Sequence, residues 1–165
     1  MKQIAVVGTG YVGLVTGTCF AETGNRVTCI DIDAQKVEKM KQGQIPIYEP
    51  ELDVLFERNI KAGRLQFTTD LAAGIQDAEI IFLALPTPPG EDGSADLSYI
   101  IGVANELGKL ITDYKVIVDK STVPVGTAEK VHAAVLEHAT CDFDIVSNPE
   151  FLREGAAVYD FQNPD

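Results

Sequence analysis

Six short apolar runs recur along the chain, and they limit the folds that it can adopt. They cover residues 3–7, 26–31, 65–69, 79–85, 115–121 and 143–148. Runs rich in Val and Ile that do not alternate with polar residues are typical of strands buried on both faces of a parallel sheet. The segments between the runs have a helical pattern, and they cover residues 11–23, 34–42, 50–61, 70–78, 97–112 and 124–139. This alternation predicts an α/β fold: a doubly wound, Rossmann-type, mostly parallel sheet with helices on both faces.

The acidic composition argues against two classes of partner. The chain has 165 residues, enough for one domain with its own core. It carries 25 acidic and 13 basic residues, which gives a formal charge of −12. A surface of this sign repels phosphate backbones and anionic lipid headgroups. We therefore expect neither nucleic acid nor a membrane among its partners.

The cysteines indicate a reducing compartment. Cys19, Cys29 and Cys141 are an odd number and show no CxxC spacing, so they are expected to be free thiols. No apolar run approaches the roughly 20 residues that a membrane helix needs. No basic and then apolar signal segment opens the chain either. Together these features predict a cytoplasmic protein.

A glycine pattern follows the first apolar run directly. Gly8, Gly10 and Gly13 have the spacing G-x-G-x-x-G at the start of a predicted helix. The first glycine allows a tight turn, the second lets the backbone approach a pyrophosphate, and the third lets helix and strand pack closely. The phosphates would lie at the helix N-terminus, where backbone N–H groups are free. The motif predicts a dinucleotide site.

The end of the second run predicts which dinucleotide binds. Asp31 lies 18 residues after Gly13, at the place where a carboxylate can accept hydrogen bonds from a ribose 2′-OH. Asp31 would repel a 2′-phosphate, and Asp33 would add to that repulsion. We therefore predict NAD rather than NADP as the cofactor. Lys36 either flanks the adenosine end of the site or is a solvated lysine on a helix.

Polar residues also follow the later strands. Thr87 follows the fourth run, Ser121 and Thr122 end the fifth, and Glu150 and Glu154 follow the sixth. Ligands of doubly wound sheets bind outside the carboxyl ends of the strands, so these side chains are expected to meet the cofactor. Thr and Ser also cap helices, which is the structural alternative for them. The long segment 86–96 is either a functional loop or a surface loop.

Five segments resemble, in the same order, the NAD-binding domain of the UDP-glucose/GDP-mannose dehydrogenase family. They are GTGYVGL, PIYEPEL, TPPGEDGSADLSY, KSTVPVGT and NPEFLREGAAVYDF. The resemblance covers nearly the whole chain, and the YEP and STVPVGT segments are most similar to the UDP-glucose 6-dehydrogenases. Members of the family oxidise the C6 alcohol of a nucleotide sugar to a carboxylate with two NAD. The resemblance implies that residues 1–165 are the NAD-binding domain of an enzyme that makes UDP-glucuronate from UDP-glucose, as in polysaccharide biosynthesis.

The resemblance also implies roles for matching positions. The pyrophosphate would be held by Gly8, Thr9, Gly10, Tyr11, Val12 and Gly13. The adenosine ribose would be held by Asp31 and Lys36. The nicotinamide end would be lined by Thr87, Ser121, Thr122 and Glu154. No metal is implied.

Two residues are implied as catalytic. Thr122 would position a water near the reacting carbon, and Glu150 would do acid–base work in hydrolysing the intermediate. The sugar nucleotide would be bordered by Glu150, Phe151, Leu152, Arg153 and Glu154. Glu150 and Glu154 would share one side of a helix if a helix starts there, and two close carboxylates push their pKa values apart. The structural alternative is a solvated pair of glutamates around Arg153.

The family's second oxidation uses a cysteine nucleophile, with a lysine and an asparagine from a central helix beside it. None of the three cysteines lies in a matching motif. We therefore expect a central helix and a UDP-sugar-binding domain beyond the chain. The chain alone should bind NAD weakly, without turnover, as a monomer, whereas the longer enzyme should be a homodimer.

Two alternatives remain open at this stage. The substrate of the longer enzyme could instead be GDP-mannose or UDP-N-acetylmannosamine, because the contacts to sugar and base are expected mostly outside the chain. A different class is a non-catalytic NAD-sensing module, which needs only the Gly8–Asp31 part of the pattern. Such a module has no chemical use for the STVP and PEFLREG segments.

Overall fold

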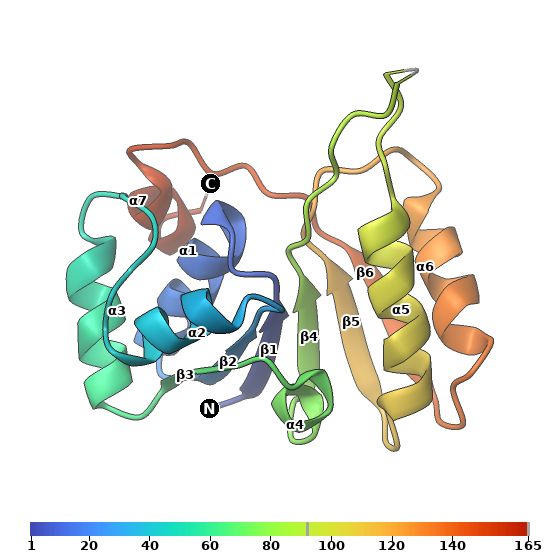
Figure 1. Cartoon of the computed structure of the whole chain (residues 1–165), viewed down its shortest axis with the longest axis horizontal. Helices are drawn as coiled ribbons and strands as arrows, with labels where there is room; N and C mark the ends of the chain where they lie inside the picture. Colours follow the sequence, from blue (N-terminus) through green and yellow to red (C-terminus); the bar gives the residue numbers. More distant parts are fainter. Residues whose placement is uncertain (92, 165) are drawn as a thin grey trace.

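The computed structural model describes residues 1–91 and 93–164, and its centre is one six-stranded sheet (Figure 1). The strands are β1 (Gln3–Val7), β2 (Arg26–Ile30), β3 (Leu65–Thr68), β4 (Ile80–Leu83), β5 (Lys115–Asp119) and β6 (Phe143–Ser147). Their order across the sheet is β3-β2-β1-β4-β5-β6, and every neighbouring pair is parallel. The predicted doubly wound, Rossmann-type fold is confirmed.

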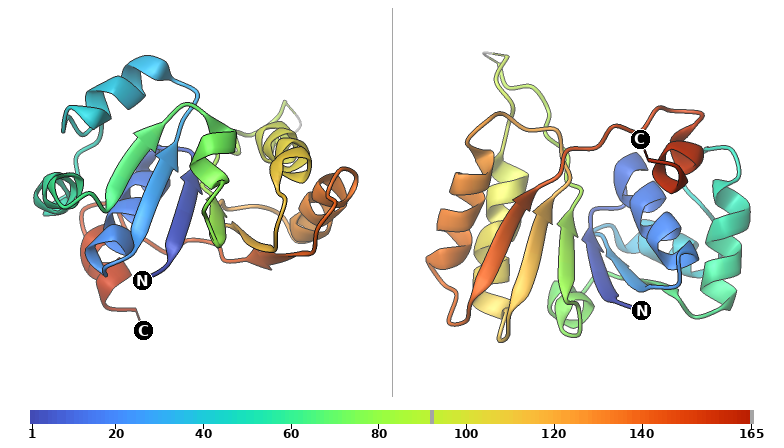
Figure 2. Two further views of the ribbon diagram at one scale, coloured as in Figure 1. Left: turned by 90° about the horizontal axis from the view of Figure 1, so that it is seen from below. Right: turned by 180° about the vertical axis from the view of Figure 1, so that it is seen from behind.

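Helices cover both faces of the sheet (Figure 2). They are α1 (Tyr11–Glu22), α2 (Ala34–Lys41), α3 (Leu52–Lys61), α4 (Leu71–Ile75), α5 (Ser98–Leu110), α6 (Thr127–Leu136) and α7 (Ala157–Gln162). The buried side chains of α1, α2 and α3 pack on one face of the sheet, and those of α4, α5 and α6 pack on the other. The short helix α7 packs against α1, so the last helix of the chain lies beside the first.

Two helices begin later than their patterns predict, because the backbone turns first. The segment 50–61 becomes helical at Leu52, after Glu51 with a φ of 68°. The segment 124–139 becomes helical at Thr127, after Gly126 with a φ of 88°. Left-handed residues of this kind are turn positions, and Glu51 is the one non-glycine example among the described residues.

The expectation that every strand is buried on both faces is wrong for β6. Phe143 and Ile145 are partly buried and the other three residues are exposed, Val146 by 41%. Strand β6 lies at the edge of the sheet, where α6 packs against it. An edge strand covered by a helix on one face leaves the other face open.

The order of the strands reverses between β1 and β4. The chain runs from β1 outwards to β3, then crosses to β4 and continues to β6. A crevice forms at such a reversal, outside the carboxyl ends of the strands, because the two following connections leave in opposite directions. The fold therefore places the ends of β1, β2, β4 and β5 around one opening.

Candidate functional site

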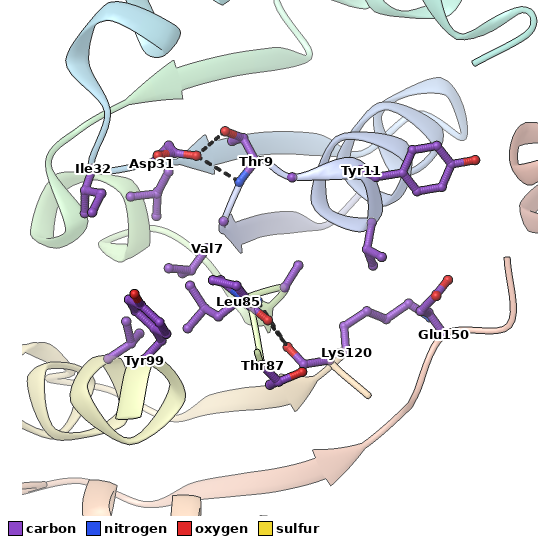
Figure 3. A pocket seen from close by; sticks show the side chains of 18 of the residues that line it. Val7, Thr9, Tyr11, Asp31, Ile32, Leu85, Thr87, Tyr99, Lys120 and Glu150 are labelled. Atoms are coloured by element: carbon purple, nitrogen blue, oxygen red, sulfur yellow. Dashed lines mark hydrogen bonds between the residues drawn. The ribbon is translucent and has the colours of Figure 1, made fainter. Parts of the chain in front are cut away.

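A cleft of about 630 Å³ opens at this reversal, a size suited to a small molecule or cofactor. Its walls come from the glycine turn after β1, the end of β2, the segments after β4 and β5, and the start of α5. Asp31 and Ile32 lie at one end of the cleft, and Lys120 and Glu150 lie at the other (Figure 3). Of the polar side chains expected at this edge, Thr87, Ser121, Thr122 and Glu150 line the cleft, whereas Glu154 lies outside its described lining.

The glycine turn makes the closest backbone contacts at the site. Gly8 has a φ of 101°, and an added Cβ there would lie 2.2 Å from the Ala84 carbonyl oxygen. An added Cβ at Gly13 would lie 1.9 Å from the Gly8 carbonyl oxygen. Neither position accepts a side chain, because backbone atoms already occupy the space. The turn and the first turn of α1 are packed as the motif requires.

Gly10 differs from its two neighbours in the motif. It is exposed, and an added Cβ there would meet nothing within 4 Å in the described part of the chain. Gly10 is the N-cap of α1 and has no side-chain cap hydrogen bond among the described residues. The first N–H groups of a helix have no partner within the helix. The cleft therefore has an open, donor-rich surface suited to an anion.

The Asp31 carboxylate is held firmly at the end of β2. Its Oδ2 accepts hydrogen bonds from the Thr9 backbone N–H (3.1 Å) and from the Thr9 hydroxyl. Oδ1 accepts the Asp33 N–H (3.0 Å), and Lys36 Nζ lies 3.1 Å from Oδ2. Burial alone would raise the pKa of Asp31, but these hydrogen bonds and the Lys36 charge outweigh it and hold the pKa below its ordinary value. The carboxylate is ionised at neutral pH.

Lys36 is not simply a solvated helix residue. Its side chain is 27% exposed, forms the ion pair with Asp31 and lines the cleft. Asp33 has a separate local role, because its side chain caps α2 by accepting the N–H groups of Gln35 and Lys36. Of the two aspartates, Asp31 is therefore the one that faces the cleft.

Apolar side chains line the same end of the cleft. They include Ile32 after β2, Leu71 in α4, and Tyr99 and Val103 in α5. Ile32 is 95% exposed and Tyr99 is 51% exposed, so both present apolar surface to the opening. The sequence pattern did not predict these residues, because exposed apolar residues near helix starts are common in ordinary surfaces.

The residues after β4 and β5 are joined to one another. The Ser121 hydroxyl accepts the Leu85 N–H (3.1 Å) and donates to the Leu85 carbonyl oxygen (2.9 Å). The Thr87 hydroxyl donates to the Thr122 carbonyl oxygen (3.1 Å). All four residues line the cleft. Ser121 is buried and bonded to backbone, so its hydroxyl holds the wall of the cleft together.

Glu150 and Lys120 lie at the end of the cleft away from Asp31. Lys120 is 9% exposed, and its Nζ donates to the Asn148 side-chain oxygen (3.2 Å). Burial lowers the pKa of Lys120, and the negative charge of Glu150 acts in the opposite direction. Lys120 was not among the predicted site residues, although it directly precedes the predicted pair Ser121–Thr122.

The remaining residues predicted to border the substrate lie apart from the cleft lining. Residues 148–153 are irregular, Gly155 has a φ of 85°, and α7 begins only at Ala157. No helix starts at Glu150, so the condition for a shared helical face of Glu150 and Glu154 is not met. Phe151, Arg153 and Glu154 are exposed, Leu152 is half-buried, and the described lining contains none of these four.

Arg153 is bound to Asp160, a residue of α7. Its guanidinium forms a two-pronged ion pair with Asp160 of α7, at 3.0 Å and 2.7 Å. Glu150 accepts the Leu152 backbone N–H through Oε2 (3.0 Å). The segment 148–156 is thus arranged by local hydrogen bonds and by its connection to α7.

Glu49 is a buried carboxylate that the sequence analysis missed. It accepts hydrogen bonds from the Tyr11 hydroxyl, the Gly155 N–H and the Ala157 N–H. Burial would raise its pKa, but these three donors hold the pKa below its ordinary value. Glu49 lies in the segment PIYEPEL. Its position between apolar residues and Pro50 could have indicated a buried carboxylate that accepts hydrogen bonds.

No group of three or more His, Cys, Asp or Glu side chains suited to a metal ion occurs in residues 1–91 and 93–164. None of the helices in the described ranges is both long and apolar enough to cross a bilayer. Cys19 and Cys29 are buried free thiols, and burial raises the pKa of each to about 12.

Comparisons with known proteins agree with this geometry. Residues 2–165 match the UDP-glucose/GDP-mannose dehydrogenase family, NAD binding domain. The UDP-glucose 6-dehydrogenase TuaD of Bacillus subtilis (strain 168) is 53% identical over 165 residues, which is 99% of this chain and 36% of that protein. A UDP-glucose dehydrogenase structure from the archaeon Pyrobaculum islandicum has a TM-score of 0.96 at 42% identity, covering 100% of this chain and 39% of that one.

A second solved structure extends the comparison to another sugar nucleotide. The GDP-mannose dehydrogenase of Pseudomonas aeruginosa has a TM-score of 0.90 at 34% identity, covering 99% of this chain and 39% of that one. This chain therefore spans well under half the length of the relatives that it matches. Because the family match extends from residue 2 to residue 165, the chain belongs to the UDP-glucose/GDP-mannose dehydrogenase family and is its NAD binding domain.

Proposed function

We propose that the chain is the NAD-binding domain of a UDP-glucose 6-dehydrogenase, which oxidises UDP-glucose to UDP-glucuronate with two NAD. The observation that carries the proposal is the pairing of the open Gly10 turn with the anchored Asp31 carboxylate in one cleft. The turn offers donors for a pyrophosphate, and the carboxylate offers acceptors for a ribose. The 53% identity to a UDP-glucose 6-dehydrogenase supports this choice of substrate.

The residues present suit NAD along the length of the cleft. The N–H groups at the start of α1 would hold the pyrophosphate beside Gly10, and Asp31 would accept the adenosine ribose hydroxyls. The ionised Asp31 carboxylate would repel the extra phosphate of NADP. The apolar side chains of Ile32, Leu71 and Tyr99 would border the adenine.

The other end of the cleft would receive the nicotinamide, which accepts a hydride from the substrate. Thr87 and Thr122 line that end, and Ser121 holds their backbone in place. Glu150 is an acid–base group beside Lys120, and we propose that it acts in hydrolysing the intermediate. Roles for Glu154 and for Phe151, Leu152 and Arg153 stay predictions, because these residues lie outside the described lining of the cleft.

The remaining catalytic groups would come from the part of the longer relatives that this chain does not cover. We propose that a central helix and a sugar-nucleotide-binding domain supply the cysteine and lysine and form the homodimer, and that this domain alone is a monomer. Three free cysteines support a reducing location, for which we propose the cytoplasm. GDP-mannose stays the second candidate substrate, since a GDP-mannose dehydrogenase shares this fold at 34% identity.

Two measurements test the proposal. Calorimetric titration of the chain should give binding of NAD and much weaker binding of NADP, and equal affinities would contradict the role of Asp31. NADH formation by the gene's complete product, assayed with UDP-glucose, GDP-mannose and UDP-N-acetylmannosamine, tests the substrate. Fastest turnover of GDP-mannose would replace UDP-glucose in the proposal, and an absence of turnover with all three would favour a non-catalytic sensor.

A further inference from the structure

The Glu49 carboxylate joins three parts of the chain that are far apart in sequence. The residue is 4% exposed and lies in the segment between α2 and α3. Its Oε2 accepts the Tyr11 hydroxyl (2.5 Å) and the Gly155 N–H (2.8 Å), and its Oε1 accepts the Ala157 N–H (2.8 Å). One buried side chain therefore holds the first residue of α1 and the residues that lead into α7.

The segments that Glu49 connects both contribute residues to the cleft lining. Tyr11 follows Gly10 in the glycine turn and lines the cleft. Gly155 closes the segment 148–156, and Glu150 of that segment also lines the cleft. The two structures that the proposed cofactor would touch, the turn and the segment 148–156, are thus connected through Glu49 behind the cleft wall.

Several hydrogen bonds hold segment 148–156, among them those from Lys120 Nζ to the Asn148 side chain and from Arg153 to Asp160 of α7. At the start of the segment, the Asn148 N–H donates to the Asp119 carbonyl oxygen (2.9 Å). At its end, the Gly155 and Ala157 N–H groups donate to Glu49. Packing of α7 against α1 is a competing anchor, because Ala157 and Val158 share an apolar cluster with Val15 and Cys19.

The charge of Glu49 strengthens the link. Burial raises the pKa of Tyr11, as does its hydrogen bond to Glu49, so the hydroxyl keeps its proton and donates. The Glu49 pKa is held below its ordinary value by its donors despite burial, so the carboxylate stays ionised. Hydrogen bonds to an ionised acceptor are about twice as strong as neutral ones.

We propose that Glu49 is a positioning residue that couples NAD binding to the ordering of segment 148–156. The inference rests on the proposed function, since it assumes that NAD occupies the cleft. If NAD binds only when Glu150 is in its observed place, molecules with an open segment cannot bind it. The apparent affinity is then the intrinsic affinity multiplied by the fraction of molecules with a closed segment. Reciprocity requires that NAD closes the segment by the same factor.

The test compares Glu49→Gln with the wild-type chain in two measurements. Amide hydrogen exchange at Gly155 and Ala157 reports the opening of the segment, and calorimetric titration reports NAD affinity. The variant loses the charge and at least one hydrogen bond, so we expect exchange at both amides to be faster by roughly tenfold or more. We expect NAD affinity to fall by the same factor, and saturating NAD to restore slow exchange.

Glu57→Gln is the matched control, because Glu57 is an exposed residue of α3 whose ion pair with Lys61 lies at the surface. It should change neither measurement. A purely structural role for Glu49 would leave NAD affinity unchanged in Glu49→Gln, with fast exchange at Gly155 and Ala157 that NAD does not slow. That result would overturn the inference.

Tyr11→Phe provides a milder version of the same test if Glu49→Gln does not fold. It removes one of the three hydrogen bonds and leaves the packing of α7 in place. Matched changes in exchange and affinity support the coupling, and a change in exchange alone overturns it. Failure of the proposed function looks different, because the wild-type chain itself then binds no NAD.

Discussion

The Asp31 carboxylate at the end of β2 accepts the backbone N–H of Thr9, which lies in the glycine turn after β1 (3.1 Å). The predicted ribose-binding residue and the predicted phosphate-binding turn are thus bonded directly to one another. A change at Asp31 therefore alters both the charge of the cleft and the position of the turn.

Replacement of Asp31 by Asn should weaken NAD binding and reduce the preference for NAD over NADP. The amide keeps one acceptor but loses the charge that pairs with Lys36 and repels a 2′-phosphate. Loss of hydrogen bonds to a charged group amounts to about 1.5–3 kcal/mol, so we expect NAD affinity to fall about tenfold or more in calorimetric titration. Asp77→Asn is the control, because Asp77 is exposed and lies before the N-terminal end of β4, whereas the cleft lies at the C-terminal ends of the strands. Unchanged discrimination in Asp31→Asn would contradict the assignment.

Gly13→Ala should destabilise the domain and abolish NAD binding. The new methyl group would lie 1.9 Å from the Gly8 carbonyl oxygen, so α1 or the turn has to move. Overpacking of this kind costs about 1–3 kcal/mol in the free energy of unfolding, which urea denaturation measures. Gly102→Ala is the matched control in α5, where an added Cβ meets nothing within 4 Å among the described residues. There we expect a gain of up to about 1 kcal/mol, because Ala favours a helix over Gly. Equal effects of the two substitutions would refute the packing argument.

Asp119→Asn should stabilise the domain at neutral pH and have little effect in acid. Burial raises the pKa of Asp119, and its Oδ2 has no hydrogen-bond partner in the part of the chain that the structure describes. A raised pKa means that the folded protein takes up this proton more readily than the unfolded chain. The wild-type protein therefore loses stability as pH rises through the folded pKa of Asp119, whereas the variant does not. Urea denaturation across the acid-to-neutral range should give two curves that separate as pH rises. Parallel curves would show that Asp119 is not the group responsible.

Thiol labelling of the native protein should modify Cys141 first. Cys19 and Cys29 have no exposed surface, and burial raises the pKa of each thiol to about 12, which leaves almost no reactive thiolate. Cys141 is only partly buried. Mass spectrometry after brief alkylation should find one fast site, and Cys141→Ser should remove it. Rapid modification of Cys19 or Cys29 would mean that α1 or β2 unfolds locally often enough to expose the thiol.

The fold could be predicted because its signals are local. Strands β1 and β4 are continuous apolar runs, and the glycine motif combines a strand, a turn and a helix within a few residues. The gathering of Thr87, Thr122 and Glu150 at one cleft also followed, since parallel strands end at the same edge. Helix starts were less accurate where a left-handed residue such as Gly126 comes first.

The misses arise from contacts between distant parts of the chain. Glu49 binds Gly155 and Ala157, which are 106 and 108 residues away, and no local pattern reports such a pairing. The spacing of Glu150 and Glu154 allows a helix but does not cause one. Gly155, directly after Glu154, has a left-handed backbone conformation, which an α-helix cannot contain.

The reach of Glu49 along the chain also bears on how the protein is made. On a ribosome the segment with Glu49 emerges long before Gly155 and Ala157, which are 106 and 108 residues later. Until those residues arrive, the carboxylate lacks two of its donors and must remain in water or take up a proton. Strands β1, β2 and β3 are synthesised before β4, β5 and β6, but helix α1 gains its contacts with α7 only when the end of the domain has been made.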